Sequence, residues 1–237
     1  MLDIQHISKT YANGKEAVKD LTLTVEAGDI YGFIGANGAG KTTTIKAVVG
    51  IHGFDEGDIQ ILGHSIREEP VKCKQQFAFL PDNPNLYEQL TGYQYIDFIG
   101  NVYGVPMEKR NSIVEQYARI FELEPALDNL ISSYSHGMKQ RLALIAALVH
   151  GPKLLILDEP FVGLDPKGAY HLKEIMKERA AAGCAIFFST HVLEVAEKLC
   201  NKVAIMKAGR LVANGNLDEV KGASSLETIF MELQDDE

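Results

Sequence analysis

The residues Gly35-Ala36-Asn37-Gly38-Ala39-Gly40-Lys41-Thr42 indicate the fold class of this chain. This stretch follows an apolar run, residues 30–34, that is typical of a strand, and it leads into a helix-like segment, residues 41–49. Glycines in such a loop let backbone N–H groups curl around phosphate oxygens, and the lysine can reach the β- and γ-phosphates of a nucleotide. Because strand, loop and helix occur in the order that this pattern requires, the stretch predicts a phosphate-binding loop rather than a glycine-rich turn.

This loop supplies most of the predicted nucleotide contacts. We expect the nucleotide to touch Gly35, Ala36, Asn37, Gly38, Ala39, Gly40, Lys41, Thr42 and Thr43. The hydroxyl of Thr42 is also a suitable oxygen ligand for Mg²⁺. The chain contains one such loop and no internal repeat, which disfavours a tandem arrangement of two nucleotide-binding units.

Two carboxylates follow a short apolar run, Leu154-Leu155-Ile156-Leu157, and precede Pro160. The run predicts a buried strand, and at the end of such a strand the backbone turns, so both acids can reach one site. Asp158 is then the expected partner of Mg²⁺, directly or through water. Glu159 is the expected catalytic base, which orients and deprotonates the attacking water. The alternative, an acidic pair that merely ends a strand, is disfavoured by the apolar run before the pair and the proline after it.

A third segment, Tyr134-Ser135-His136-Gly137-Met138-Lys139-Gln140-Arg141, leads into another helix-like run, residues 138–149. Apolar residues recur in this run at helical spacing. The free N–H groups and the positive dipole at the start of such a helix attract an anion. Seen alone, Ser135 is more simply a serine that caps a surface helix. The acidic strand end that follows, at residues 154–160, favours the anion-binding interpretation.

Together, these three segments resemble the phosphate loop, the signature motif and the Walker B strand of ABC ATPases, and the resemblance covers nearly the whole chain. It implies an α/β fold: a P-loop NTPase core with a mostly parallel sheet, an antiparallel β-subdomain and an inserted α-helical subdomain. It also implies ATP and Mg²⁺ as cofactors. In this family Ser135 and Gly137 would bind the γ-phosphate of ATP held by the opposite subunit. The active site would therefore be split between two chains.

The resemblance assigns three further residues. Gly163-Leu164-Asp165 matches the family's D-loop. The resemblance therefore makes Asp165 a candidate catalytic residue, in addition to Lys41 and Glu159. His191 follows the apolar run at residues 185–188 and would contact the γ-phosphate, since a neutral imidazole can donate from one nitrogen while the other is held by a neighbouring group. Tyr11 lies where the family places an aromatic ring against adenine, although a tyrosine after a short strand also serves as ordinary packing.

One position departs from the family pattern. Asp82, within Phe79-Leu80-Pro81-Asp82-Asn83-Pro84, stands where the family commonly has glutamine. An aspartate can approach Mg²⁺ through water, but it cannot donate a hydrogen bond as an amide does. Asp82 therefore remains a candidate metal contact. The prolines on either side support the other family role of this segment, as a hinge to the helical subdomain.

The composition is that of an intracellular ATPase. Its 237 residues, 46% of them hydrophobic, suffice to bury a sizeable core. A net charge of −9 without a basic face argues against a nucleic-acid partner. The chain starts without a signal-peptide pattern, its apolar runs fall short of the roughly 18 residues that a transmembrane helix needs, and its three cysteines lack metal-ligand spacing. We therefore expect a cytoplasmic protein, peripheral on the inner face of the cell membrane through a partner.

The order of predicted elements indicates one ABC-type ATP-binding domain over residues 1–237. We expect the ATPase core at residues 1–81 and 151–237 and the helical subdomain at about 82–150. Continuous apolar runs, such as residues 154–157 and 185–188, predict buried parallel strands, whereas the alternating run at residues 21–25 predicts an antiparallel edge.

Within the family, residues 86–91 and 134–141 look most like ABC-2-type bacterial exporter cassettes. We therefore expect a homodimer or heterodimer of ATP-binding subunits that powers export through integral-membrane permease subunits. Leu86, Tyr87 and Leu90 give the segment near Asp82 an apolar face for such a partner, or else they fill the subdomain's core. A non-transport ABC ATPase that acts on a soluble complex would carry the same motifs. A P-loop kinase would not need the signature or the histidine.

Overall fold

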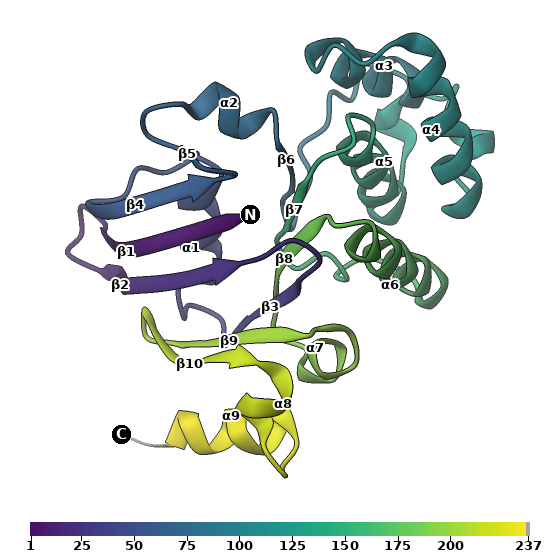
Figure 1. Cartoon of the computed structure of the whole chain (residues 1–237). Helices are drawn as coiled ribbons and strands as arrows, with labels where there is room; N and C mark the ends of the chain where they lie inside the picture. The colour runs from purple at the N-terminus through teal and green to yellow at the C-terminus, as the bar shows by residue number, and fades with distance from the viewer. Residues whose placement is uncertain (236–237) are drawn as a thin grey trace.

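The computed structural model describes residues 1–235 and is built around a six-stranded sheet (Figure 1). The strands lie in the order β10-β9-β3-β8-β7-β6, and every neighbouring pair is parallel except β9 and β10. Their bounds are β3 (Ile30–Gly35), β6 (Phe77–Leu80), β7 (Leu154–Leu157), β8 (Ala185–Thr190), β9 (Lys202–Lys207) and β10 (Arg210–Asn216).

The central strands of this sheet are buried on both faces. Every residue of β3, β7 and β8 is buried. Parallel strands covered on two faces carry near-continuous apolar runs, which explains why the runs at residues 154–157 and 185–188 were recognisable as strands. The strand β8 continues two residues past its apolar run, where the hydroxyls of Ser189 and Thr190 are both hydrogen-bonded.

A four-stranded antiparallel sheet covers one face of the central sheet (Figure 1). Its order is β2-β1-β4-β5, with bounds β1 (Leu2–Thr10), β2 (Glu16–Val25), β4 (Glu56–Ile61) and β5 (His64–Ser65). Burial alternates along the last part of β2, as expected for a strand with one packed face, so the predicted antiparallel edge at residues 21–25 is confirmed. The packed face shares a core with helix α1 (Lys41–Val48) and with central-sheet residues such as Phe33 and Phe187.

Helices cover the opposite face of the central sheet. Helices α5 (His136–Leu148), α6 (Pro166–Ala181) and α7 (Leu193–Leu199) share one core with strand residues such as Leu155 and Ile186. The neighbours of these two residues along each strand, Ile156 and Phe187, belong to the other core. Side chains of a strand point alternately to its two faces, so the six-stranded sheet separates the two cores.

The elements between β6 and β7 are helical, as predicted. They are α3 (Gly92–Val102), α4 (Met107–Ile120), the short 3₁₀ helices η1 (Glu124–Ala126) and η2 (Ile131–Ser133), and α5. The remaining helices are α2 (Pro70–Lys74), α8 (Leu217–Lys221) and α9 (Leu226–Asp235). Figure 1 places α3 and α4 on the side of the central sheet away from β1, β2 and β4. None of the helices within residues 1–235 combines the length and the apolar character that a bilayer crossing requires.

The topology brings the predicted motifs to one edge of the central sheet. Strand β8 lies between β3 and β7, with Ile34 opposite Thr190 and Leu157 opposite Phe188. The phosphate loop after β3, the acidic pair after β7 and His191 after β8 therefore all follow the carboxyl ends of neighbouring parallel strands. Ligands of open α/β sheets bind at this edge.

Candidate functional site

The phosphate loop needs glycine at its two ends because other chain segments pass close to them. A Cβ atom on Gly35 would lie 2.6 Å from the carbonyl oxygen of Met206, and one on Gly40 would lie 2.3 Å from the carbonyl oxygen of Ala17. Gly40 also has a φ of 115°, in the left-handed region, where it precedes α1. The loop is thus a tight backbone cradle at a helix N-terminus, the arrangement that binds phosphate groups.

Lys41 points back into this cradle. Its ammonium group is almost fully buried and donates hydrogen bonds to the carbonyl oxygens of Gly35 at 2.6 Å and Ala36 at 3.4 Å. The carboxylate of Glu159 lies 3.7 Å from the same nitrogen. A buried ammonium with mostly carbonyl partners favours an anionic ligand, so the cradle suits the phosphates of a nucleotide.

Asp158 is buried directly after β7. Burial raises the pKa of its carboxyl above the ordinary value, and hydrogen bonds from the hydroxyls of Ser189 and Thr42, the second at 3.5 Å, lower it in part. The charges of Asp82 and Glu159 raise it further. A buried carboxylate beside the Thr42 hydroxyl favours a hard cation at this place.

The oxygen ligands at this place fit Mg²⁺ shared with a nucleotide. Within residues 1–235, no group of three or more His, Cys, Asp or Glu side chains is arranged to hold a metal ion. Mg²⁺ is usually held by one or two protein oxygens together with substrate phosphates, and Thr42 and Asp158 offer such a pair.

Glu159 lies between two nitrogen-bearing side chains. One carboxylate oxygen faces Lys41, and the other lies 3.0 Å from Nδ1 of His191. The imidazole of His191 therefore lies directly beside the Glu159 carboxylate, and an imidazole can donate from either nitrogen to a neighbouring ligand. The structure therefore places Lys41, Glu159 and His191, three of the predicted catalytic residues, next to one another.

A cavity of about 240 Å³ opens over the cradle. It is lined by Tyr11, Lys15, Ala17, Ala36, Asn37, Gly38, Gly40, Lys41, Thr42, Thr43, Asp82 and Glu159. Lys15 and Ala17 were not expected here; a lysine in a turn and an alanine early in a strand belong to no sequence motif. The hydroxyl of Tyr11 is hydrogen-bonded to that of Thr43 at 3.1 Å, which fixes its ring beside the cavity.

Asp82 lies on the wall of this cavity. Its carboxylate accepts a hydrogen bond from the backbone N–H of Asn83 at 2.8 Å, and it is close enough to Asp158 to raise the pKa of that carboxyl. The side chain is thus near the expected metal position, at the end of the segment that leads to α3.

The signature residues Ser135 and Gly137 lie outside the lining of this cavity. Helix α5 begins at His136, two residues earlier than expected, and the hydroxyl of Ser135 accepts a hydrogen bond from the Met138 N–H at 3.3 Å. Gly137 is therefore part of the first helical turn, and a Cβ atom on it would lie 3.1 Å from the carbonyl oxygen of Gly163. Asp165 caps α6 through the Gly168 N–H and pairs with Arg141. Among the described residues, Ser135, Gly137 and Asp165 do not belong to the cavity lining.

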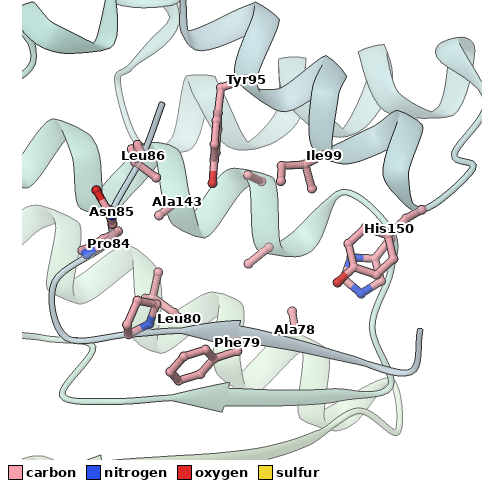
Figure 2. Close-up of a pocket in the computed structure, with 14 residues that line it drawn as sticks. Ala78, Phe79, Leu80, Pro84, Asn85, Leu86, Tyr95, Ile99, Ala143 and His150 are labelled. Atoms are coloured by element: carbon pink, nitrogen blue, oxygen red, sulfur yellow. The ribbon is translucent and has the colours of Figure 1, made fainter. Parts of the chain in front are cut away.

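A second cavity, of about 160 Å³, lies between β6, the segment after it, and helices α3 and α5 (Figure 2). Leu86 and Tyr95 contribute to its wall, and the stacked rings of Tyr103 and His150 close one end. The expectation that Leu86, Tyr87 and Leu90 form one exposed face is wrong for Leu86, which is buried in this wall; Tyr87 is exposed and Leu90 is half-buried.

Ser189 is a contact that the sequence analysis missed. Its hydroxyl lies within hydrogen-bond distance of both the Asp158 carboxylate and the Glu159 backbone. A serine inside an apolar strand carries no motif, and only the pairing of β7 with β8 reveals its neighbours.

Comparisons with known proteins agree with this geometry. The model of the ABC transporter family matches residues 18–162. The ABC transporter ATP-binding protein YhcH of Bacillus subtilis is 36% identical, over 99% of this chain and 75% of its own length. The Nod factor export ATP-binding protein I of Burkholderia lata is 34% identical, over 90% of this chain and 70% of its own length.

Solved structures show the same fold. A structure of an ATP-binding subunit of an ABC transporter superimposes with a TM-score of 0.95 at 35% identity, covering 99% of both chains. The dimeric ATP-binding cassette MJ0796 has a TM-score of 0.83 at 22% identity, over 92% of this chain and 99% of its own, a likeness of fold. The chain therefore belongs to the ABC transporter family, as an ATP-binding subunit that hydrolyses ATP.

Proposed function

We propose that this chain is the motor subunit of an ABC exporter: it hydrolyses ATP as a dimer and drives separate membrane subunits. The observation that carries the proposal is the contact of Glu159 with Lys41 and His191 beside the phosphate cradle. Ser135, by contrast, does not line the cavity over this cradle. One chain thus offers a phosphate site and a base, and a second chain would add the signature.

Each residue near the cradle has a defined task in this proposal. The loop N–H groups and Lys41 bind the phosphates of ATP, and Glu159 accepts a proton from the attacking water. His191, whose Nδ1 lies 3.0 Å from the Glu159 carboxylate, contacts the γ-phosphate through its other ring nitrogen. Thr42 and Asp158 would hold Mg²⁺, with Asp82 as a further contact through water. When bound, Mg²⁺ would neutralise negative charge on the phosphate oxygens.

The signature and the D-loop lie close together, as a composite site requires. Gly137 packs against Gly163, and Arg141 joins the signature helix to Asp165. A second subunit, identical or different, would present Ser135 and Gly137 to the phosphates of the first. A cassette of the same fold is dimeric in its solved structure, which is compatible with two such chains pairing.

The direction of transport is proposed from a relative. The Burkholderia lata protein is named for Nod factor export, and the motif wording at residues 86–91 and 134–141 points to the same branch. We place the chain in the cytoplasm, at the inner face of the membrane and attached through its permease. The alternative, an ABC ATPase that acts on a soluble complex, would lack that attachment.

The proposed docking surface for the membrane partner lies on the segment before α3 and on α3 itself. Tyr87, Phe98 and Val102 are exposed, and the rings of Tyr87 and Phe98 meet edge to face with their centres 5.4 Å apart. Phe98 and Val102 are one helical turn apart and share a face. The cavity of Figure 2 lies next to this surface, where Leu86 forms its wall.

Membrane recovery tests the docking surface. Changing Tyr87 and Phe98 to serine should leave the basal ATPase rate of the isolated subunit nearly unchanged and abolish its recovery with membranes that contain the permease. The matched control is Tyr170→Ser, which removes an equally exposed aromatic ring from α6. Wild-type recovery of the double variant, or equal loss in the control, would refute this surface.

Substitution of Glu159 tests the proposed chemistry. Glu159→Gln removes the base but keeps the cradle, so turnover should fall about 10²- to 10⁴-fold while ATP binding persists. Phosphate release measures turnover, and light scattering with ATP should detect an accumulated dimer. Near-normal turnover of the variant would remove Glu159 from the catalytic role.

A further inference from the structure

The end of β8 makes an unusual pair of contacts with the acidic pair after β7. Ser189 is fully buried, and its hydroxyl donates a hydrogen bond to the Asp158 carboxylate at 2.5 Å. The same oxygen accepts the backbone N–H of Glu159 at 2.9 Å. One hydroxyl therefore contacts both Asp158, the proposed metal ligand, and Glu159, the proposed base.

The sheet holds Asp158 through β6 but gives the Glu159 backbone no partner on β8. The pairing of β7 with β8 ends at Leu157 and Phe188, so Asp158 and Glu159 lie beyond the ladder of hydrogen bonds. The N–H of Asp158 turns the other way, to the carbonyl oxygen of Leu80 at 2.8 Å. The contact from Ser189 thus replaces the missing ladder bond for Glu159.

Glu159 needs this support because its backbone conformation is unfavourable. Its φ is 47°, in the left-handed region, which costs a non-glycine residue about 1 kcal/mol or more. Such conformations persist where surrounding contacts determine them, often at functional sites. Here the conformation directs the Glu159 side chain towards Lys41 and His191.

The hydroxyl of Ser189 has only one way to serve both neighbours. It has a single hydrogen, and the Glu159 N–H requires one of its lone pairs. The hydrogen goes to the carboxylate oxygen of Asp158, at 2.5 Å. The hydroxyl therefore links the Asp158 carboxylate to the Glu159 backbone.

We propose that Ser189 is a positioning residue for ATP hydrolysis, whose hydroxyl fixes the Asp158 carboxylate and the Glu159 backbone relative to the phosphate cradle. This inference rests on the proposed roles of Asp158 and Glu159. It adds a residue that touches neither the nucleotide nor the water and acts through the two that do. Loss of such supporting contacts typically costs about 10- to 100-fold in metal affinity or activity.

Three substitutions at Ser189 separate hydrogen bonding from packing. Ser189→Ala deletes both contacts. Ser189→Cys keeps nearly the same size with a weak donor and acceptor, and Ser189→Thr keeps the hydroxyl. We expect kcat to fall about 10- to 100-fold in the Ala and Cys variants, with a KM for ATP within about threefold of wild type, and to recover in the Thr variant.

Cys184→Ala is the matched control. Cys184 is a buried residue of similar size directly before β8, at the other end of the strand, and its thiol contacts the carbonyl oxygen of Pro152. Its removal should lower the melting temperature about as much as Ser189→Ala does, without a change in kcat. Wild-type kcat in the Cys variant, or equal kcat losses in Ser189→Ala and Cys184→Ala, would overturn the inference.

A second measurement does not depend on turnover. The gain in affinity for a fluorescent ATP analogue on adding Mg²⁺ should shrink severalfold in Ser189→Ala and stay at the wild-type value in Cys184→Ala. An unchanged gain in Ser189→Ala would contradict the role of Ser189 even if the wild-type protein proved inactive. Absence of wild-type turnover alone would instead count against the proposed function.

Discussion

Ser135 has a structural duty in the single chain and a second duty in the proposed dimer. Its hydroxyl accepts the Met138 N–H and so caps α5. At the same helix end, free N–H groups can bind an anion from outside. The two duties predict different consequences when the hydroxyl is removed, since a cap contributes stability and a phosphate contact contributes rate.

A comparison of two helix caps separates these duties. Ser225 caps α9 in the same way, through the Thr228 N–H at 3.1 Å. Ser135→Ala and Ser225→Ala should each lower the free energy of unfolding by about 1 kcal/mol. Only Ser135→Ala should also lower kcat, by about 10²-fold for the loss of one donor to a developing charge. Equal ATPase rates in the two variants would leave Ser135 with its capping role alone.

At the scale of elements, the pair α3 and α4 depends on one buried arginine. Arg110 donates to the carboxylate and the carbonyl oxygen of Asp97, to the side chain of Asn101 and to the carbonyl oxygen of Val105. The arginine side chain fits only because residue 100 is glycine: a Cβ atom on Gly100 would lie 2.3 Å from Nε of Arg110. Helix α3, which carries part of the proposed docking surface, is therefore fastened to α4 by polar contacts as well as by packing.

Gly100→Ala tests this fastening. The added methyl group must displace the arginine, so the free energy of unfolding should fall by about 1–3 kcal/mol. At Gly53 a Cβ atom would meet no other atom within 4 Å, and Gly53→Ala should change stability by less than about 0.5 kcal/mol. Urea unfolding measures both. A stability of Gly100→Ala equal to that of Gly53→Ala would show that Arg110 moves aside without cost.

The elements that were predictable from sequence are those with a strong local pattern. The apolar strands β7 and β8 and the loop before α1 follow directly from their residues. The start of α5 was placed two residues late because Gly137 lowers helix propensity, whereas the serine cap decides the observed start. The burial of Leu86 and the contacts of Ser189 depend on segments far apart in the chain, which no local pattern reports.

Across the whole molecule, the proposed catalytic groups lie in two separate places. Lys41, Glu159 and His191 surround the phosphate cradle, and Ser135 and Asp165 lie at the starts of α5 and α6, outside the cavity lining. A single chain therefore holds both halves of the proposed site but does not bring them together. A dimer in which each chain completes the cradle of the other would do so.

Mixing two inactive variants shows whether the two chains share their sites. Lys41→Ala damages the cradle, and Ser135→Arg blocks the signature, so each variant alone should be inactive. In a mixed dimer one site carries both lesions and the other carries neither. Mixed in equal amounts, the two should regain about a quarter of the wild-type ATPase rate, because half of the random dimers are mixed and each of these has one intact site of two. No regained activity above the sum of the separate variants, together with a wild-type rate strictly proportional to protein concentration at high dilution, would contradict a shared site.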